Sequence, residues 1–196
     1  FGDFRLRGVE ADFNRPDDQP DRYRARIRFR LGAEYSFWDK QMAVGALLST
    51  GNKDDPRSPY VSFGQLFEDF DIFLDRAYLR YSPSFFEGSS FIGGKFGLTL
   101  KNKAIYNELV WDYDVQPEGV AASYKRENIG PIDDISLTVG QYIVEENDSR
   151  ISWLTTPQIV FSNSFAEVYK VTLGAGGFLY YGHNLTPGGS TKLVTP

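Results

Sequence analysis

The segment from residue 22 to residue 37 alternates strictly between polar and apolar side chains. Every odd position in it is apolar, and its first five even positions are Arg22, Arg24, Arg26, Arg28 and Arg30. Such alternation predicts a β-strand with one face in water and the other in an apolar environment. Strands of globular sheets usually have ~5–6 residues, whereas a strand that crosses a bilayer needs ~9–11. The segment therefore indicates a transmembrane strand, along which the five arginines form an arginine ladder about 27 Å tall.

The overall composition also favours β structure. Aromatic residues make up 16% of the 196 residues, and 19 residues are glycine, a mixture that is typical of sheets rather than helices. No run of about eighteen apolar residues marks a transmembrane helix, but a transmembrane barrel needs no such run, because each strand shows lipid only one face. The net charge of −5 gives no reason to expect nucleic-acid binding, and a chain without cysteine forms no disulfide.

The alternation and the turn residues predict nine antiparallel strands in a single domain that spans residues 1–196. Their predicted ranges are 3–13, 22–37, 41–50, 72–81, 90–100, 115–125, 135–144, 156–162 and 168–181. Short turns are predicted after the second, fourth, sixth and eighth strands, and longer loops, including 51–69 and 145–150, after the third, fifth and seventh. Bacterial outer-membrane barrels have this asymmetry. The predicted fold class is therefore an all-β, antiparallel transmembrane β-barrel.

Two details of these strands bear on the membrane. Aromatic residues gather where strands meet short turns, as at Phe37, Trp38, Tyr81 and residues 85–86, and aromatic belts of this kind lie at membrane interfaces. Asp75 falls on the apolar face of its strand. We therefore expect that Asp75 either lies above the membrane or marks a β-bulge that changes the register.

Several short motifs resemble a known family in their order and spacing. They are GDFRLR at 2–7, LGA at 31–33, DRAYL at 75–79, LVWD at 109–112 and QPEG at 116–119. Together they resemble the putative porins of Gram-negative outer membranes and, more loosely, the alginate-export barrels. The resemblance implies a barrel through which small hydrophilic solutes or ions diffuse. Members of that family carry more strands, and single-chain bacterial barrels have even strand numbers. We therefore expect this chain to be the N-terminal part of a larger barrel, incomplete at both ends.

The arginine ladder is the main candidate for function. In a water-filled lumen, stacked guanidinium groups attract anions and repel cations. Arginines ~7 Å apart on one face repel each other, so we expect acidic partners across the lumen or on an inward-folded loop. The predicted pore-lining residues are Arg22, Arg24, Arg26, Arg28, Arg30, Arg76, Arg80, Lys95 and Lys170, and the predicted acids of a constriction loop are Asp54, Asp55, Glu68, Asp69 and Asp71. The alternatives are an ionic network that only braces the wall and the solvated face of a soluble sheet.

The remaining polar residues indicate neither catalysis nor metal binding. The acidic run 68–71 with Asp75 has the carboxylate oxygens that calcium prefers, but it lacks the spacing of an EF-hand loop. We interpret it, like Asp112 and Asp114, as solvated loop acids. His183 is the only histidine, so no transition-metal site is expected, and no positioned base accompanies a serine nucleophile. We therefore expect a protein that is not an enzyme and has no cofactor.

Three functions stay open from the sequence alone. The first is an outer-membrane diffusion channel, with short turns in the periplasm and long loops outside the cell. Its partners would be outer-membrane lipids and small hydrophilic solutes or ions, without nucleic acid, and it could act as a monomer or as a homotrimer. The second is a secreted, soluble β-sandwich that binds carbohydrate. The third is a barrel with a structural role in a larger envelope complex.

Overall fold

The computed structural model describes residues 1–11, 22–51, 58–64, 70–99, 112, 114–130, 132–147, 150–165 and 169–182. Within these ranges the regular secondary structure is β-strand, and no helix is long and apolar enough to cross a membrane. The strands are β1 (Gly2–Ala11), β2 (Arg22–Phe37), β3 (Met42–Thr50), β4 (Val61–Ser62), β5 (Ile72–Tyr81), β6 (Ser89–Lys95), β7 (Glu118–Ile129), β8 (Ile132–Asn147), β9 (Arg150–Phe165), β10 (Tyr169–Gly176) and β11 (Leu179–Tyr181).

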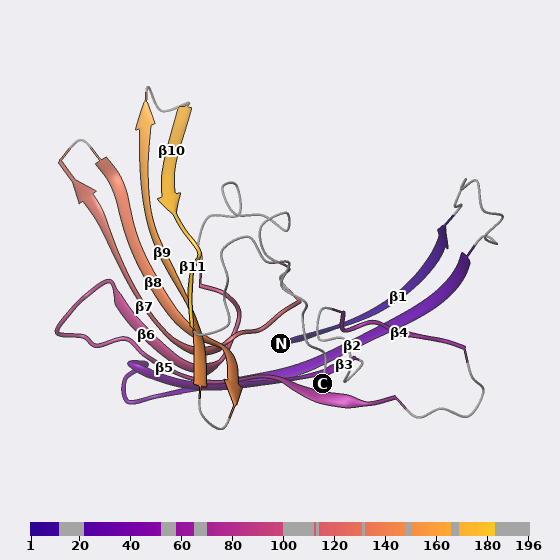
Figure 1. Ribbon diagram of the computed structural model, residues 1–196. Helices are drawn as coiled ribbons and strands as arrows, with labels where there is room; N and C mark the ends of the chain where they lie inside the picture. Colours follow the sequence, from indigo (N-terminus) through magenta and orange to yellow (C-terminus); the bar gives the residue numbers. More distant parts are fainter. Residues whose placement is uncertain are drawn as a thin grey trace.

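The strands form one antiparallel sheet that is bent into an open trough (Figure 1). Its main order, β1-β2-β3-β5-β6-β7-β8-β9-β10, follows the chain, while β4 pairs with β2 and β11 pairs with β9. The predicted all-β, antiparallel fold is thereby confirmed. The described strands do not close on themselves, since β1 and β10 lie at opposite edges of the sheet. Closure into a barrel and the extent of the domain stay predictions.

The two faces of the trough differ in chemistry. On the convex face of β2, Tyr23 and Tyr35 are each 69% exposed, whereas Arg28 on the concave face is only 8% exposed. The next strand continues the same division, because Leu31 of β2 pairs with Leu48 of β3, and both are exposed. A contiguous apolar surface of this kind marks a face that lipid or another protein covers.

The connections between strands differ in length at the two ends of the sheet. Residues 38–41, 82–88, 130–131 and 166–168 separate strands at one end, while 12–21, 51–71 and 96–117 separate strands at the other. The predicted long loop 145–150 is wrong, because β8 and β9 continue until Asn147 pairs with Arg150. Backbone pairing needs no apolar side chains, so this hairpin extends into polar sequence where the alternation of side chains gives no signal.

Several other predicted boundaries are wrong. β6 ends at residue 95 rather than 100, and β9 covers 150–165, so residues 163–165, which were predicted to lie between two strands, belong to a strand. The predicted strand 168–181 is interrupted between β10 and β11, where the Gly177 amide donates to the Pro157 carbonyl at 3.0 Å. β4 was not predicted at all, because two residues are too few for a periodic pattern.

Asp75 lies at a β-bulge in β5. Leu47 of β3 pairs with Arg76 and Leu48 pairs with Leu74, so Asp75 has no partner residue across the strand pair. The extra residue shifts the alternation by one position. The apolar residues on both sides of the bulge therefore stay on the convex face, and the second of the two predicted alternatives is confirmed.

The apolar core lies on the concave side, over β6 to β9. It consists of the buried residues Phe96, Ala121, Tyr142 and Leu154. The rings of Phe96 and Tyr142 are 5.9 Å apart with an interplanar angle of 55°, a favourable tilted contact. Gly140 makes room for Tyr142, since a Cβ at position 140 would lie 2.3 Å from the Tyr142 hydroxyl. This core anchors the residues that follow β6 against the wall of the trough.

Candidate pore wall and constriction

The arginine ladder lies on the concave face, where β1 adds two more arginines to it. Arg5 pairs with Arg28 and Arg7 pairs with Arg26 across the β1–β2 ladder. Residues directly opposite in an antiparallel pair share a face, so these four guanidinium groups form one patch, which we call the arginine quartet. Arg5 and Arg7 were not predicted as pore-lining residues, although the alternation in residues 3–7 indicates that they share a face.

Among the described residues, two carboxylates contact the ladder, and neither was among the predicted acids. Arg28 Nε donates to Asp3 Oδ1 at 2.8 Å, and Arg30 Nη2 donates to Asp114 Oδ1 at 2.5 Å. The Arg28 and Arg30 side chains are 10% and 14% exposed, so both charge-assisted hydrogen bonds are partly shielded from water and are stronger than surface pairs. The interpretation of Asp114 as a solvated acid is therefore wrong.

The predicted constriction-loop acids are placed only in part. Asp54, Asp55, Glu68 and Asp69 lie outside the described residues, so their predicted role stays a prediction. Asp71 is described and has an exposed side chain just before β5.

Tyr60 lies against the arginine quartet. Its ring centroid is 5.4 Å from Cζ of Arg26 and 5.1 Å from Cζ of Arg28, and its hydroxyl accepts a hydrogen bond from Arg5 Nη1 at 3.2 Å. The backbone there is also fixed, since Thr50 Oγ1 donates to the Pro59 carbonyl at 2.9 Å and β4 pairs with β2. A tyrosine ring stabilises neighbouring guanidinium groups by ~0.5–2 kcal/mol, but it does not neutralise their charge.

A second layer covers part of the concave face, and it comes from the connection between β6 and β7 (Figure 1). Phe96 packs against Tyr142, the hydroxyls of Thr99 and Tyr142 are 3.2 Å apart, and the Phe96 amide donates to the Pro117 carbonyl. Asp114 of the same connection reaches Arg30. Residues 96–99 and 114–117 of this connection therefore occupy space over the concave face.

Four further predicted lining cations each have a carboxylate neighbour. The pairs are Arg76–Asp75 at 3.7 Å, Arg80–Glu34 at 2.7 Å, Lys95–Glu118 at 3.1 Å and Lys170–Asp134 at 3.7 Å. Lys95 is in register with Ala77, which is one of the apolar residues of β5 on the convex face. Arg24 is half-buried and in register with Val9, whereas Arg22 is placed in β2 without a described side chain. The described predicted cations thus span several strands of the sheet instead of one.

The half of the concave face formed by β7 to β10 carries mainly short, neutral polar side chains. Its buried members include Ser136, Thr138, Ser152, Thr156, Gln158 and Ser162. They share a face by register, since Thr138 pairs with Gln158. These residues were not predicted as pore-lining residues, because only charged residues were named as candidates. The alternation over residues 152–162 nevertheless indicates that its polar side chains share one face. The trough therefore has a cationic side and a neutral polar side.

A comparison with protein families decides what kind of protein this is. A family model described as Putative porin (Porin_5) matches residues 8–188. The chain belongs to this porin family. No curated protein and no solved structure matches the chain. Membership confirms the resemblance to the putative porins and indicates a porin-like outer-membrane channel.

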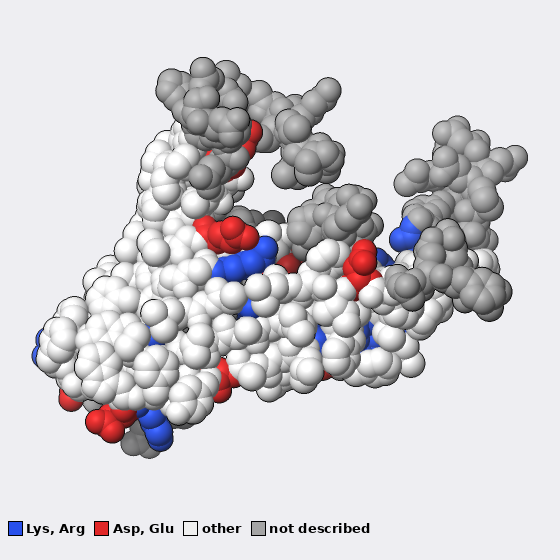
Figure 2. Space-filling model, turned by 90° about the horizontal axis from the view of Figure 1, so that it is seen from below, with Lys and Arg blue, Asp and Glu red and all other residues white. Residues whose placement is uncertain are grey.

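The convex face of this porin has the chemistry of a lipid-facing surface. Seen from below, the molecule is mostly uncharged, with a few small groups of charged side chains (Figure 2). Aromatic side chains stack at the short-turn end, where Trp38 and Tyr81 have ring centroids 6.4 Å apart and Phe86 and Tyr124 have centroids 5.2 Å apart. This arrangement is the one expected for an aromatic belt.

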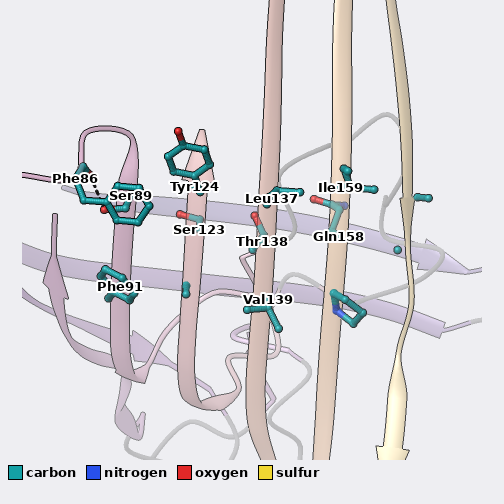
Figure 3. A pocket seen from close by; sticks show the side chains of 14 residues that line it. Phe86, Ser89, Phe91, Ser123, Tyr124, Leu137, Thr138, Val139, Gln158 and Ile159 are labelled. Carbon is teal, nitrogen blue, oxygen red and sulfur yellow. Dashed lines mark hydrogen bonds between the residues drawn. The ribbon is translucent and has the colours of Figure 1, made fainter. Parts of the chain in front are cut away.

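A shallow depression of ≈ 610 Å³ lies across β6 to β10 of the porin (Figure 3). Phe91, Leu137, Val139 and Ile159 border it, and by register these residues belong to the convex face. Ala122 also lines it, and its small side chain leaves space between larger neighbours. The depression is therefore a feature of the apolar outer surface, on the opposite side of the sheet from the arginine quartet.

Proposed function

We propose that this porin contributes the wall of an outer-membrane channel through which small hydrophilic solutes and ions diffuse, and that the arginine-rich side of the wall favours anions. The uneven charge of the concave face is the observation that carries this proposal. Among the described residues, the arginine quartet has one carboxylate contact, from Asp3 to Arg28. Unbalanced cationic charge on a pore wall raises the local concentration of anions and lowers that of cations.

The second layer supports a channel in which size also restricts passage. Residues 96–99 and 114–117 occupy space over the concave face, so a solute has to pass between this layer and the arginine wall. Passage of this kind needs no covalent chemistry. In the proposed orientation the short turns with their aromatic belt lie in the periplasm, and the longer connections lie outside the cell.

A soluble carbohydrate-binding β-sandwich has less support. A sandwich packs two sheets through apolar inner faces. The described strands of this porin form a single sheet with an uncovered apolar convex face and a largely polar concave face. The apolar face is therefore on the outside, unlike in a sandwich, and this arrangement is expected for a wall between lipid and water.

Planar-bilayer recording across a KCl gradient tests the proposal. The protein is expected to conduct ions, and the triple substitution R24Q/R26Q/R28Q is expected to shift the reversal potential towards cation preference, because it removes three positive charges from the wall. K40Q, which removes one charge from the exposed turn between β2 and β3, is the control and should leave the reversal potential unchanged. Absence of conductance would refute the channel, whereas conductance without a shift would leave the arginines as a structural brace.

A further inference from the structure

We propose that the arginine quartet, together with Tyr60, is a binding subsite for a small oxyanion of the phosphate type. The inference deepens the proposed function and rests on it for its physiological meaning, since it adds a step at which a passing solute is held at the wall. Binding itself is measurable on the protein in detergent, whether or not the protein conducts.

The charge of the quartet is the first argument. Like charges directly opposite each other in a strand pair are destabilising, and the quartet contains two such pairs, Arg5–Arg28 and Arg7–Arg26. Asp3 is the carboxylate that the described structure brings to it. Among the described residues, four guanidinium groups and one carboxylate give the patch a formal charge of +3, which a bound multivalent anion would offset.

Unused hydrogen-bond donors are the second argument. Arg26 Nε is buried and has no hydrogen-bond partner among the described residues. A buried donor without a partner destabilises the folded protein, because it has lost its hydrogen bonds to water. The described bonds of Arg5 and Arg26 go to neutral oxygens of Tyr60 and Ser58, and each guanidinium has five N–H groups. Ligand oxygens at the quartet would satisfy donors that this part of the protein leaves free.

Tyr60 gives the third argument, because it fixes the geometry. Its ring lies over the guanidinium groups of both Arg26 and Arg28, and its hydroxyl binds Arg5. Three of the four side chains are thereby held together despite their mutual repulsion. Guanidinium groups fixed in this way present planar pairs of N–H groups, which match the oxygens of phosphate in bidentate fashion and have no such match with a spherical chloride ion.

Three other arginines of the concave face differ from the quartet in their carboxylate contacts. Arg30, Arg76 and Arg80 each contact a carboxylate of their own, from Asp114, Asp75 and Glu34 respectively. Each of those pairs is formally neutral. The quartet is the place in the described structure where several guanidinium groups share a single carboxylate.

Isothermal titration calorimetry with inorganic phosphate tests the inference on the full-length protein in detergent, with ionic strength held constant by chloride. Saturable binding is expected for the wild type. R26K keeps the charge but loses the bidentate fork, and it should weaken binding by at least about tenfold, as expected for the loss of a charge-assisted hydrogen bond. R7K replaces an exposed arginine, and it should also weaken phosphate binding. R126K makes the same substitution in β7, where Arg126 pairs with Ile135 of the convex-face series, and should leave phosphate binding unchanged.

Two results would overturn the subsite. One is the absence of saturable phosphate binding to the wild type, which would also be the result if a carboxylate of the chain's own connections filled the quartet. The other is binding that R126K weakens as much as R26K does. Chloride conductance measured on the same preparation separates the two proposals. Binding without conductance would support the subsite and refute the channel, and conductance without binding would refute the subsite alone.

Discussion

Asp114 Oδ1 lies 2.5 Å from Nη2 of Arg30, although the two residues are 84 positions apart in the chain. Arg30 belongs to β2, and Asp114 precedes β7, with β3, β5 and β6 lying between these strands in the sheet. The segment that carries Asp114 must therefore cross the concave face to make this contact. The pair holds the described residues next to Asp114 over the arginine side of the trough.

Neutralising Asp114 should widen the channel. D114N replaces a charge-assisted hydrogen bond with a neutral one of roughly half the strength, so residues 114–117 should be held less firmly and single-channel conductance should rise. Loss of a negative charge should also increase anion preference. The control is D71N, which removes an exposed acid outside the second layer. Unchanged conductance in D114N would show that Phe96 packing alone holds the layer in place.

Gly45 should be needed for the wall to pack. Tyr78 lies over it, so that a Cβ at position 45 would be 2.4 Å from the Tyr78 ring, and the Tyr78 hydroxyl donates to Glu34 Oε2 at 2.7 Å. G45A should therefore lower the free energy of unfolding by ~1–3 kcal/mol, the usual cost of overpacking. G8A is the matched control, because nothing lies within 4 Å of a Cβ at position 8. Urea unfolding in lipid vesicles measures both, and equal effects would contradict the prediction.

The two faces should respond differently to an added charge. Leu173 on the convex face is 67% exposed, and a charged residue that faces lipid near the bilayer midplane costs ~2–4 kcal/mol. L173R should therefore destabilise the protein in vesicles, while T172R, one residue away on the concave face, should have a smaller effect because that face is wet. Equal tolerance of both substitutions in unfolding measurements would show that Leu173 faces water.

The turn between β2 and β3 should gain stability from glycine. Trp38, Asp39 and Lys40 have φ angles of 53°, 51° and 65°, in a left-handed region that costs L-residues roughly 1–2 kcal/mol each. K40G should raise the free energy of unfolding by about 0.5–1 kcal/mol, which is the relief less the larger chain entropy of glycine. The comparison is S36G in the extended part of β2, which should be destabilising. A K40G variant that melts below the wild type would argue against the left-handed turn.

The strand bounds and the faces of side chains in the wall were predictable where polar and apolar residues alternate over many positions. The sixteen residues of β2 have the predicted bounds, and their arginines lie on one face because side chains of a strand alternate with period two. The bulge at Asp75 was predictable as one of two alternatives, since a charged residue interrupted an apolar series. The polar ends of β8 and β9 gave no such pattern, so the hairpin between them was mistaken for a loop.

The partners of the arginines could not be predicted in the same way. Asp3 is opposite Arg30 in register but bonds to Arg28 diagonally, and that choice depends on side-chain geometry. Asp114 and Tyr60 come from connections that have no periodic pattern. The sequence of these connections does not indicate which of them folds over the sheet.

Local sequence periodicity was enough to specify a sheet with one apolar and one polar face, because the polar side chains of each strand lie on the face that meets water. The family match agrees with that reading. Only the tertiary structure decided that β1 doubles the arginine patch, that Asp114 crosses the trough to Arg30, and that Tyr60 lies over Arg26 and Arg28. These contacts join segments that are distant in the chain, and their formation depends on the curvature and register of the whole sheet rather than on any local preference.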